Sequence, residues 1–255
     1  MDVVVAILAK DKAHCLPLFL SCLLKQDYSK KNTHLYIRTN DNNDSTEMIL
    51  KEFVKSYGDS YGSIFFDSSD IDASLKTFGQ HEWNHQRFKI LATIRQQSIQ
   101  YAMEKGADYF VIDCDNLIAP HTLSSMVSLR CLGVISPMLA SRTAYSNYHF
   151  SVDENGYFMA CDMYTNIRDL AIKGIHEVGV VHCTYYVSHS RLVDVCYDDD
   201  SGRYEYVIFS DSLRKKNIAQ NLDNRRFYGF ISFAETREEF MKDYTTFEGL
   251  LHELA

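Results

Sequence analysis

Short apolar runs alternate with amphipathic stretches along the first half of this chain of 255 residues. The apolar runs are rich in Val, Ile and aromatic residues, which is typical of buried strands. They predict strands at residues 3–9, 34–38, 62–66, 109–113 and 133–137. Apolar side chains at helical spacing predict helices over residues 14–25, 44–54 and 84–105, with a further helix starting near 119. Strands that alternate with helices indicate an α/β fold with a mostly parallel central sheet.

The second half of the chain has a less regular pattern. Residues 147–162 predict a small antiparallel hairpin, because the turn at 153–156 ends in Asn-Gly, a strong hairpin signal. Further elements are predicted over residues 204–215 (helix), 218–222 (strand) and 238–254 (helix). Since no repeat, low-complexity segment or linker divides the chain, we expect a single domain over residues 1–255.

The stretch Tyr109-Phe110-Val111-Ile112-Asp113-Cys114-Asp115-Asn116 has the most unusual pattern in the chain. A buried strand here ends in two carboxylates one residue apart. Carboxylate oxygens at a strand end are suited to Mg²⁺ or Mn²⁺, and such an ion often carries a diphosphate. The alternative is an ordinary acidic turn, since Asp and Asn are common in turns. This stretch alone does not decide between the two.

Polar residues also follow the first two predicted strands, at residues 9–11 and 39–44. Ligands of open α/β sheets bind outside the carboxyl ends of the strands, where these residues and Asp113–Asn116 are expected to meet. A nucleotide could lie there with its diphosphate on a metal ion held by Asp113 and Asp115. A metal that neutralises a leaving diphosphate acts as a Lewis acid, which serves glycosyl transfer from a nucleotide sugar.

Composition and charge narrow the possible functions. The chain is 46% hydrophobic and 24% charged, as is usual for a globular protein, and its net charge of −8 argues against a partner that is a nucleic acid. Seven scattered Cys residues without a CxxC motif indicate free thiols in a reducing compartment. The apolar N-terminus lacks a basic region and is too short for a transmembrane segment. We therefore expect a cytoplasmic location.

An ordered set of motifs resembles the metal-dependent glycosyltransferases of the GT-A fold, whose hallmark is D-x-D, here Asp113-Cys114-Asp115. The set is most similar to the N-terminal glycosyltransferase domain of the procollagen galactosyltransferases. The resemblance spans nearly the whole chain and is carried by Ile7-Leu8-Ala9-Lys10-Asp11, His14, Leu16-Pro17, Thr39-Asn40-Asp41-Asn42-Asn43-Asp44-Ser45-Thr46, Trp83, Arg87, Ile94-Arg95-Gln96-Gln97, Asp113-Cys114-Asp115-Asn116, Ser136-Pro137-Met138-Leu139-Ala140-Ser141-Arg142, Tyr145-Ser146-Asn147-Tyr148, Val181-His182-Cys183-Thr184 and Asn224-Arg225-Arg226-Phe227-Tyr228-Gly229.

The resemblance implies a GT-A type nucleotide-binding α/β sandwich. Residues 1–118 would be the half that binds the nucleotide sugar, and residues 119–255 the half that binds a glycan or glycoprotein acceptor. It also implies a UDP-sugar donor, UDP-galactose or UDP-glucose, transfer with inversion, and one domain of a longer multidomain enzyme. The residues implied to contact the donor are Ala9, Asp11, Asp41, Arg95 and Asp113, and those implied to hold Mn²⁺ or Mg²⁺ are Asp113 and Asp115.

Several roles remain open between alternatives. A carboxylate must deprotonate the acceptor hydroxyl, and the resemblance implies Glu205, with Asp200 as the substitute. Tyr204 and Phe227 depart from the family, whose members tend to carry an acid and a His there. His182 is either a core histidine or a third metal ligand, and Arg95 either a surface charge or a phosphate ligand.

The remaining acidic and aromatic candidates are open in the same way. Asp44 is more typical of a helix cap, whereas Asp41 is more typical of a nucleotide ligand. Trp83 is either core packing or a platform for a sugar ring.

Two other functions compete with glycosyl transfer. A metal-dependent nucleotidyltransferase would normally carry a Gly-rich loop after the first strand, and residues 9–14 contain no Gly. A catalytically inactive domain that binds sugar or nucleotide would share the fold, and the departures at Tyr204 and Phe227 favour it, whereas the intact Asp113 and Asp115 pair does not.

Overall fold

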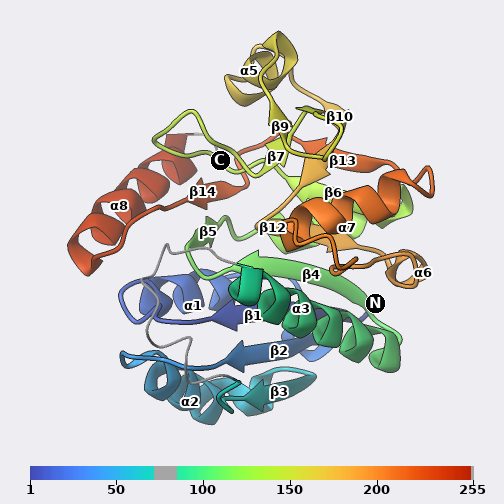
Figure 1. Cartoon of the computed structure of the whole chain (residues 1–255). Coiled ribbons are helices and arrows are strands. Elements are labelled where there is room, and N and C mark those ends of the chain that lie inside the picture. Colours follow the sequence, from blue (N-terminus) through green and yellow to red (C-terminus); the bar gives the residue numbers. More distant parts are fainter. Residues whose placement is uncertain (72–84, 254–255) are drawn as a thin grey trace.

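A computed structural model describes residues 1–71 and 85–253 of the chain. Its centre is one eight-stranded sheet with the order β10-β13-β6-β12-β4-β1-β2-β3, which runs through both halves of the chain (Figure 1). The strands are β1 (Val3–Ala9), β2 (Thr33–Thr39), β3 (Ser63–Asp67), β4 (Asp108–Asp113), β6 (Val134–Pro137), β10 (Ile175–Val178), β12 (Thr184–Val187) and β13 (Gln220–Asp223).

The first half of the chain supplies four neighbouring parallel strands, as the alternating pattern predicted. β1 lies between β2 and β4, with Ala9 opposite Thr39 and Leu8 opposite Asp113. The carboxyl ends of these strands are therefore level with one another. The second half extends the same sheet with β12 antiparallel to β4 and β6, β13 parallel to β6, and β10 antiparallel to β13.

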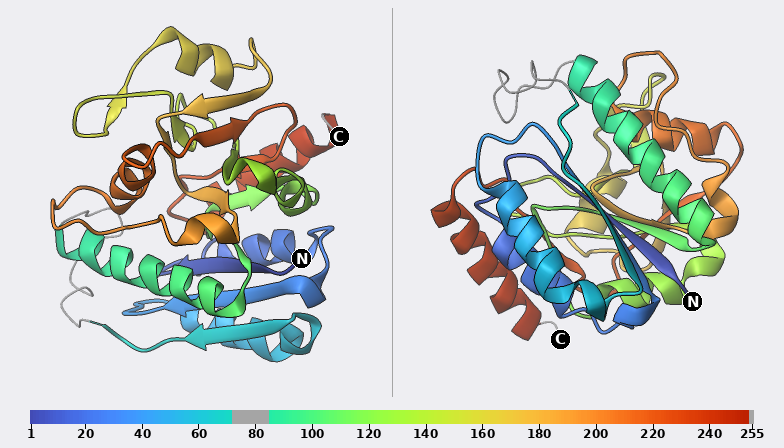
Figure 2. Two further views of the ribbon diagram at one scale, coloured as in Figure 1. Left: turned by 90° about the vertical axis from the view of Figure 1, so that its right-hand side faces the viewer. Right: turned by 90° about the horizontal axis from the view of Figure 1, so that it is seen from below.

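Helices cover both faces of the sheet (Figure 2). Along β1 the side chains alternate, so that Val3, Val5 and Ile7 enter one core cluster and Val4 and Ala6 the other. The first cluster includes residues of α1 (Leu16–Leu24), α2 (Thr46–Tyr57), α4 (Thr122–Ser128) and α8 (Arg237–Glu253). The second includes residues of α3 (His85–Lys105), α5 (Asp162–Arg168), α6 (His189–Leu192) and α7 (Glu205–Arg214). The predicted α/β sandwich is thereby confirmed.

Three small antiparallel pairs complete the second half. They are β5 (Asn116–Ile118) with β14 (Gly229–Ile231), β7 (Tyr148–His149) with β11 (Val180–Val181), and β8 (Ser151–Val152) with β9 (Phe158–Met159). The last pair is the predicted hairpin. In its turn, Asp153 accepts the backbone N–H groups of Asn155 and Tyr157, and Gly156 takes a positive φ of 90°. Within residues 1–71 and 85–253 the chain also forms the short 3₁₀ helices η1 (Lys30–Asn32), η2 (Gly58–Ser60) and η4 (Arg130–Leu132).

Two further expectations can be compared with the structure. The seven cysteines are free thiols, as their scattered spacing predicted. Across residues 1–71 and 85–253, no helix is both long enough and apolar enough to cross a membrane. Trp83 lies outside the described residues.

Candidate functional site

A cavity of about 220 Å³ lies where the carboxyl ends of β1, β2 and β4 meet α3. Ile90, Leu91 and Ile94 of α3 form an apolar wall. The loops that follow the three strands form the other walls and contribute mainly charged side chains. The parallel register places these loops together, so the cavity occupies the edge of the sheet at which the sequence predicted a ligand.

Each carboxylate of the Asp-x-Asp motif faces a cation. Asp113, the last residue of β4, accepts a hydrogen bond from Nη2 of Arg95 at 2.9 Å. Asp115, in the turn that follows, is 2.8 Å from Nζ of Lys12 through its Oδ2. The backbone of the motif is held on both sides, because Asp113 donates its N–H to the carbonyl of Cys183 and Asp115 accepts from the N–H of Ser232. The two carboxylates are therefore fixed at the cavity wall.

Asn116 had no role in the sequence analysis, and the structure buries it beside the motif. Its Nδ2 donates to Oγ1 of Thr184 at 2.8 Å, which ties the motif to β12. Its Oδ1 is buried and has no hydrogen-bond partner within the described part of the chain.

Arg95 connects the Asp-x-Asp motif to α7. Its side chain is buried, with Nη2 on Asp113 and Nε 3.5 Å from Oε1 of Glu205. Burial opposes the charge on Arg95, but the Asp113 carboxylate outweighs it and raises the pKa of Arg95 well above its ordinary value. Burial raises the pKa of Glu205, and Arg95 only partly offsets this. Burial also raises the pKa of Asp113, with Arg95 acting in the opposite direction. One guanidinium therefore lies between the buried carboxylate of Glu205 and the partly exposed carboxylate of Asp113.

The residues predicted to contact the donor have different surroundings. Ala9 and Asp11 line the cavity. The Asp11 carboxylate accepts from the backbone N–H of Asn43 at 2.6 Å and from Nζ of Lys10 at 2.7 Å, so it also joins the first two loops. Asp41 is fully buried, and its Oδ2 accepts from Nδ2 of Asn40 and from the backbone N–H of Ile71. It is Asn40, rather than Asp41, that lines the cavity among the described residues.

Asp44 lies one residue before Ser45, the N-cap of α2, so the predicted cap is displaced by one position, although the Asp44 carboxylate still accepts a backbone N–H of the helix. Its Oδ1 accepts from the backbone N–H of Thr46, the first residue of the helix, at 2.9 Å. Its Oδ2 accepts from the N–H of Ala13, so the same carboxylate also joins α2 to the loop after β1.

His182 is buried among aromatic rings. Its Nδ1 is 2.9 Å from Sγ of Cys183 and 3.3 Å from the hydroxyl of Tyr145, and its ring packs against His149 and Tyr206. Burial and the neighbouring His149 lower its pKa well below the ordinary value, so the imidazole is neutral at pH 7. No group of three or more His, Cys, Asp or Glu residues that could hold a metal is found in the described ranges. The role of His182 as a third ligand stays a prediction.

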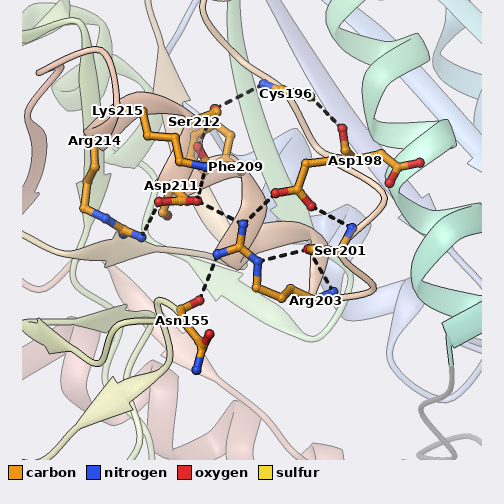
Figure 3. Close-up of polar contacts among 12 residues, drawn as sticks. Asn155, Cys196, Asp198, Ser201, Arg203, Phe209, Asp211, Ser212, Arg214 and Lys215 are labelled. Carbon is orange, nitrogen blue, oxygen red and sulfur yellow. Dashed lines mark hydrogen bonds and ion pairs between the residues drawn. The ribbon is translucent and has the colours of Figure 1, made fainter.

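Asp200 lies apart from the motif. Its side chain is 89% exposed and its carboxylate is 3.7 Å from Nζ of Lys89 on the surface of α3. Figure 3 shows how the surrounding loop is attached to α7: Arg203 pairs with Asp199 and Asp211 and donates to the carbonyl of Asn155 in the hairpin turn. The structure thus brings Glu205, and not Asp200, next to Arg95 and the Asp-x-Asp motif.

Five polar residues of the cavity wall had received no role as ligands from the sequence. They are Lys10, Lys12, Arg38, Asn40 and Arg87. Arg38 is buried and donates to the carbonyls of Thr39, Asp67 and Ser69, so it holds the ends of β2 and β3. The signal that could have identified these residues is their position near the carboxyl end of a strand, in the loop that follows it or on the helix that faces the sheet edge. A single sequence does not show which way such side chains point.

The charge of the cavity differs from that of the chain. The net charge of the whole chain is −8, yet the wall carries five cations (Lys10, Lys12, Arg38, Arg87 and Arg95) and three carboxylates (Asp11, Asp113 and Asp115). An excess of cations beside apolar side chains suits a ligand that combines an anionic part with a less polar one.

The same carboxylates fit a divalent ion that arrives with a diphosphate. Mg²⁺ and similar ions are commonly bound by one or two carboxylates together with substrate phosphates and water, without a complete protein cage. Asp113 and Asp115 provide such a pair at the cavity wall, and Asp115 is about a quarter exposed. They are the residues that would hold the ion.

Comparison with known proteins identifies one family over nearly the whole chain. The model of "Glycosyltransferase family 25, N-terminal domain" matches residues 1–252. Human procollagen galactosyltransferase 2 is 29% identical over 260 residues, which cover 98% of this chain and 41% of the relative. The mouse inactive glycosyltransferase 25 family member 3 is 25% identical over 253 residues, which cover 96% of this chain and 43% of the relative. The chain thus spans about two fifths of the length of the curated relatives that it matches.

Solved structures share the fold at low sequence identity. S. aureus TarS 1–349 in complex with UDP has a TM-score of 0.58 and 14% identity, over 95% of this chain and 63% of the other. The mannosyltransferase PcManGT from Pyrobaculum calidifontis, in complex with GDP-Man and Mn²⁺, has a TM-score of 0.51 and 14% identity, over 87% of this chain and 53% of the other. These neighbours are GT-A type glycosyltransferases, which confirms the predicted fold class.

Proposed function

The chain belongs to glycosyltransferase family 25, and on that premise we propose that it transfers a hexose from a UDP-sugar to a hydroxyl group of a glycan or glycoprotein acceptor. We further propose that the reaction depends on Mn²⁺ or Mg²⁺ and inverts the configuration at the anomeric carbon. In this proposal residues 1–118 bind the donor and residues 119–255 bind the acceptor.

One observation carries the proposal: the cavity joins a carboxylate pair for a metal with an excess of cations for a diphosphate, and Arg95 of its wall connects this pair to the buried carboxylate of Glu205. The strand-end loops that form it are the part of an α/β sheet where nucleotides bind. The relative named procollagen galactosyltransferase supports a hexose and a protein acceptor, and the solved structures with UDP and with GDP-Man and Mn²⁺ support a nucleotide sugar and a metal.

The chain's own groups have separate tasks in this reaction. A metal ion on Asp113 and Asp115 would supply Lewis-acid neutralisation of the leaving diphosphate. Arg95 holds Asp113 in place and adds positive charge to the same side of the cavity. Glu205 accepts the proton of the acceptor hydroxyl while that oxygen forms its bond to the anomeric carbon and the bond to the diphosphate breaks. A raised pKa makes the Glu205 carboxylate a stronger base than an exposed one.

A catalytically inactive member of the family is the competing function. It is favoured by the matching mouse relative that is named inactive and by the departures at Tyr204 and Phe227. In the structure Phe227 packs against the first core cluster, which contains Val3, Val5 and Ile7, and the centre of its ring is 5.9 Å from that of Phe247. Phe227 therefore has a packing role and supplies no ligand.

Calorimetric titration of the chain with UDP-galactose and UDP-glucose, each with and without Mn²⁺, tests the proposal. We expect binding that requires the metal, and hydrolysis or transfer that is lost in Asp115→Asn while the protein remains folded. Metal-dependent binding without turnover would identify the inactive alternative. No metal-dependent binding of any nucleotide sugar would refute the proposed function.

A further inference from the structure

The ammonium group of Lys12 forms an ion pair with Asp115, one of the two residues proposed to bind the metal. The two atoms, Nζ and Oδ2, are 2.8 Å apart, although the residues are 103 positions apart in the chain. Both side chains are about a quarter exposed, at 26% for Lys12 and 27% for Asp115, and both line the cavity. Burial opposes the charge on Lys12, but Asp115 outweighs it and raises the pKa of Lys12, so the side chain stays cationic at neutral pH.

The backbone of Lys12 is anchored by hydrogen bonds, whereas its side chain is about a quarter exposed. Its N–H donates to Oγ1 of Thr46 at 2.7 Å, and its carbonyl accepts from the N–H groups of Cys15 and Leu16 at the beginning of α1. A fixed Cα with a flexible four-carbon side chain lets the ammonium group move within the cavity while the loop stays in place.

Other cations of the cavity wall have more restricted positions. Arg95 is buried and held by two carboxylates, and Arg38 is buried and held by three carbonyls. Lys10 pairs with Asp11, which lies outside the Asp-x-Asp motif. Lys12 therefore combines a contact with the motif, partial exposure and a side chain suited to phosphate as a point charge.

We propose that the ammonium group of Lys12 exchanges between two anions. It pairs with the Asp115 carboxylate when the site is empty, and it pairs with the diphosphate when a nucleotide is bound. This inference rests on the proposed function and adds a device that orders the binding events. While Lys12 pairs with Asp115, it competes with a divalent ion for that carboxylate. When a diphosphate draws Lys12 away, Asp115 becomes available to the ion.

The exchange predicts positive coupling between nucleotide and metal. Because coupling between two ligands is reciprocal, UDP should increase the affinity for Mn²⁺ by the same factor as Mn²⁺ increases the affinity for UDP. It also predicts that loss of Lys12 affects the two ligands in opposite directions. A residue that serves only to hold the loop would not produce this pair of opposite changes.

The test uses Lys12→Met, which keeps an unbranched side chain one atom shorter and removes its charge. Mn²⁺ binding in the absence of nucleotide is followed by the electron paramagnetic resonance signal of the free ion. We expect the Kd for Mn²⁺ to fall about threefold to fivefold, which corresponds to the loss of a partly exposed ion pair. The Kd for UDP at saturating Mn²⁺, measured by calorimetry, should rise about tenfold or more through loss of a charge-assisted hydrogen bond.

Two variants provide the controls. Lys12→Arg keeps the charge, and we expect its two Kd values to stay within about threefold of those of the wild type. Lys10→Met removes a neighbouring cation that pairs with Asp11, and we expect its Kd for Mn²⁺ without nucleotide to stay within about twofold, since Asp11 lies outside the Asp-x-Asp motif. Circular dichroism melting checks that each variant folds.

The outcomes separate this inference from the proposed function. If the wild type binds UDP with Mn²⁺ but Lys12→Met leaves the Mn²⁺ affinity unchanged or weakens both ligands, the exchange is refuted and the proposed function stands. If the wild type binds no UDP in the presence of Mn²⁺, the proposed function fails and the exchange fails with it.

Discussion

Replacement of Arg95 by Met should destabilise the fold in a manner that depends on pH. The guanidinium is buried and contacts Asp113 at 2.9 Å and Glu205 at 3.5 Å. Methionine fills a similar space but leaves both carboxylates without their cation. The desolvation of Glu205, whose side chain is only 7% exposed, would then have no compensating charge.

The expected loss of unfolding free energy follows from how deeply Asp113 and Glu205, the two partners of Arg95, are buried. Removal of one member of a buried ion pair typically costs roughly 3–5 kcal/mol of the free energy of unfolding. The lower end applies here, because the Asp113 side chain is 30% exposed and can turn toward water. A loss of about 3 kcal/mol in a chain of this size lowers Tm by about 6–12 °C.

The direction of the pH dependence can be derived from the carboxylates. Burial already raises the pKa of Glu205 and of Asp113 in the folded protein, so each group contributes most to stability below its unfolded pKa and less as pH rises through its folded pKa. Loss of Arg95 raises both folded pKa values further. The deficit of Arg95→Met relative to the wild type should therefore grow as the pH rises from 5 to 8.

Urea unfolding of the metal-free protein between pH 5 and pH 8 measures this deficit. Arg130→Met is the matched control, because Arg130 also pairs with a buried carboxylate, Asp108, at 2.9 Å. Burial raises the pKa of Asp108, but its hydrogen bonds from Arg130, Tyr186 and the His189 N–H outweigh burial and hold the pKa below its ordinary value. Because two of these bonds remain, the control deficit should be nearly constant from pH 5 to pH 8. A constant deficit in Arg95→Met as well would refute the assignment of Arg95 as the shared counter-ion of Asp113 and Glu205.

Three further changes test other parts of the argument. Asp115→Asn should lower metal-dependent turnover by at least about 100-fold, because it removes a ligand of the metal. Its Tm, measured by calorimetry, should change by no more than about 2 °C, because the ion pair of Asp115 with Lys12 is partly exposed. A large fall in Tm together with the loss of turnover would contradict this expectation. Glu205→Gln should lower kcat by about 10²–10⁴-fold with the Kd for UDP within about threefold, and an unchanged kcat would exclude it as the base. Gly229→Ala should destabilise by about 1–3 kcal/mol in urea unfolding, because a Cβ would lie 2.2 Å from the carbonyl oxygen of Leu117. Gly58→Ala, with nothing within 4 Å, is its control, and equal effects would refute the clash.

The local hydrophobic patterns were sufficient to predict most helices and strands of the first half of the chain. Continuous apolar runs and helical spacing depend on neighbouring residues only, so β1, β2, β4 and α3 were predicted close to their observed bounds. The second half was less predictable. The apolar run at residues 178–187 is divided among β10, β11 and β12, with a positive φ of 62° at Cys183, and its last part pairs antiparallel with β4. Such pairing depends on residues far apart in the chain, which a local pattern does not report.

By itself, the sequence determined the alternation of strands and helices and the sheet edge at which the acidic motif lies, because both follow from hydrophobic periodicity and the geometry of parallel strands. Only the tertiary structure decided which cation faces each carboxylate: Lys12 faces Asp115, and Arg95 joins Asp113 to Glu205. It also decided that Asp200 points to solvent. The physical reason is that the direction of a side chain at a strand end depends on how distant loops and helices pack around it, and this information is spread over the whole chain.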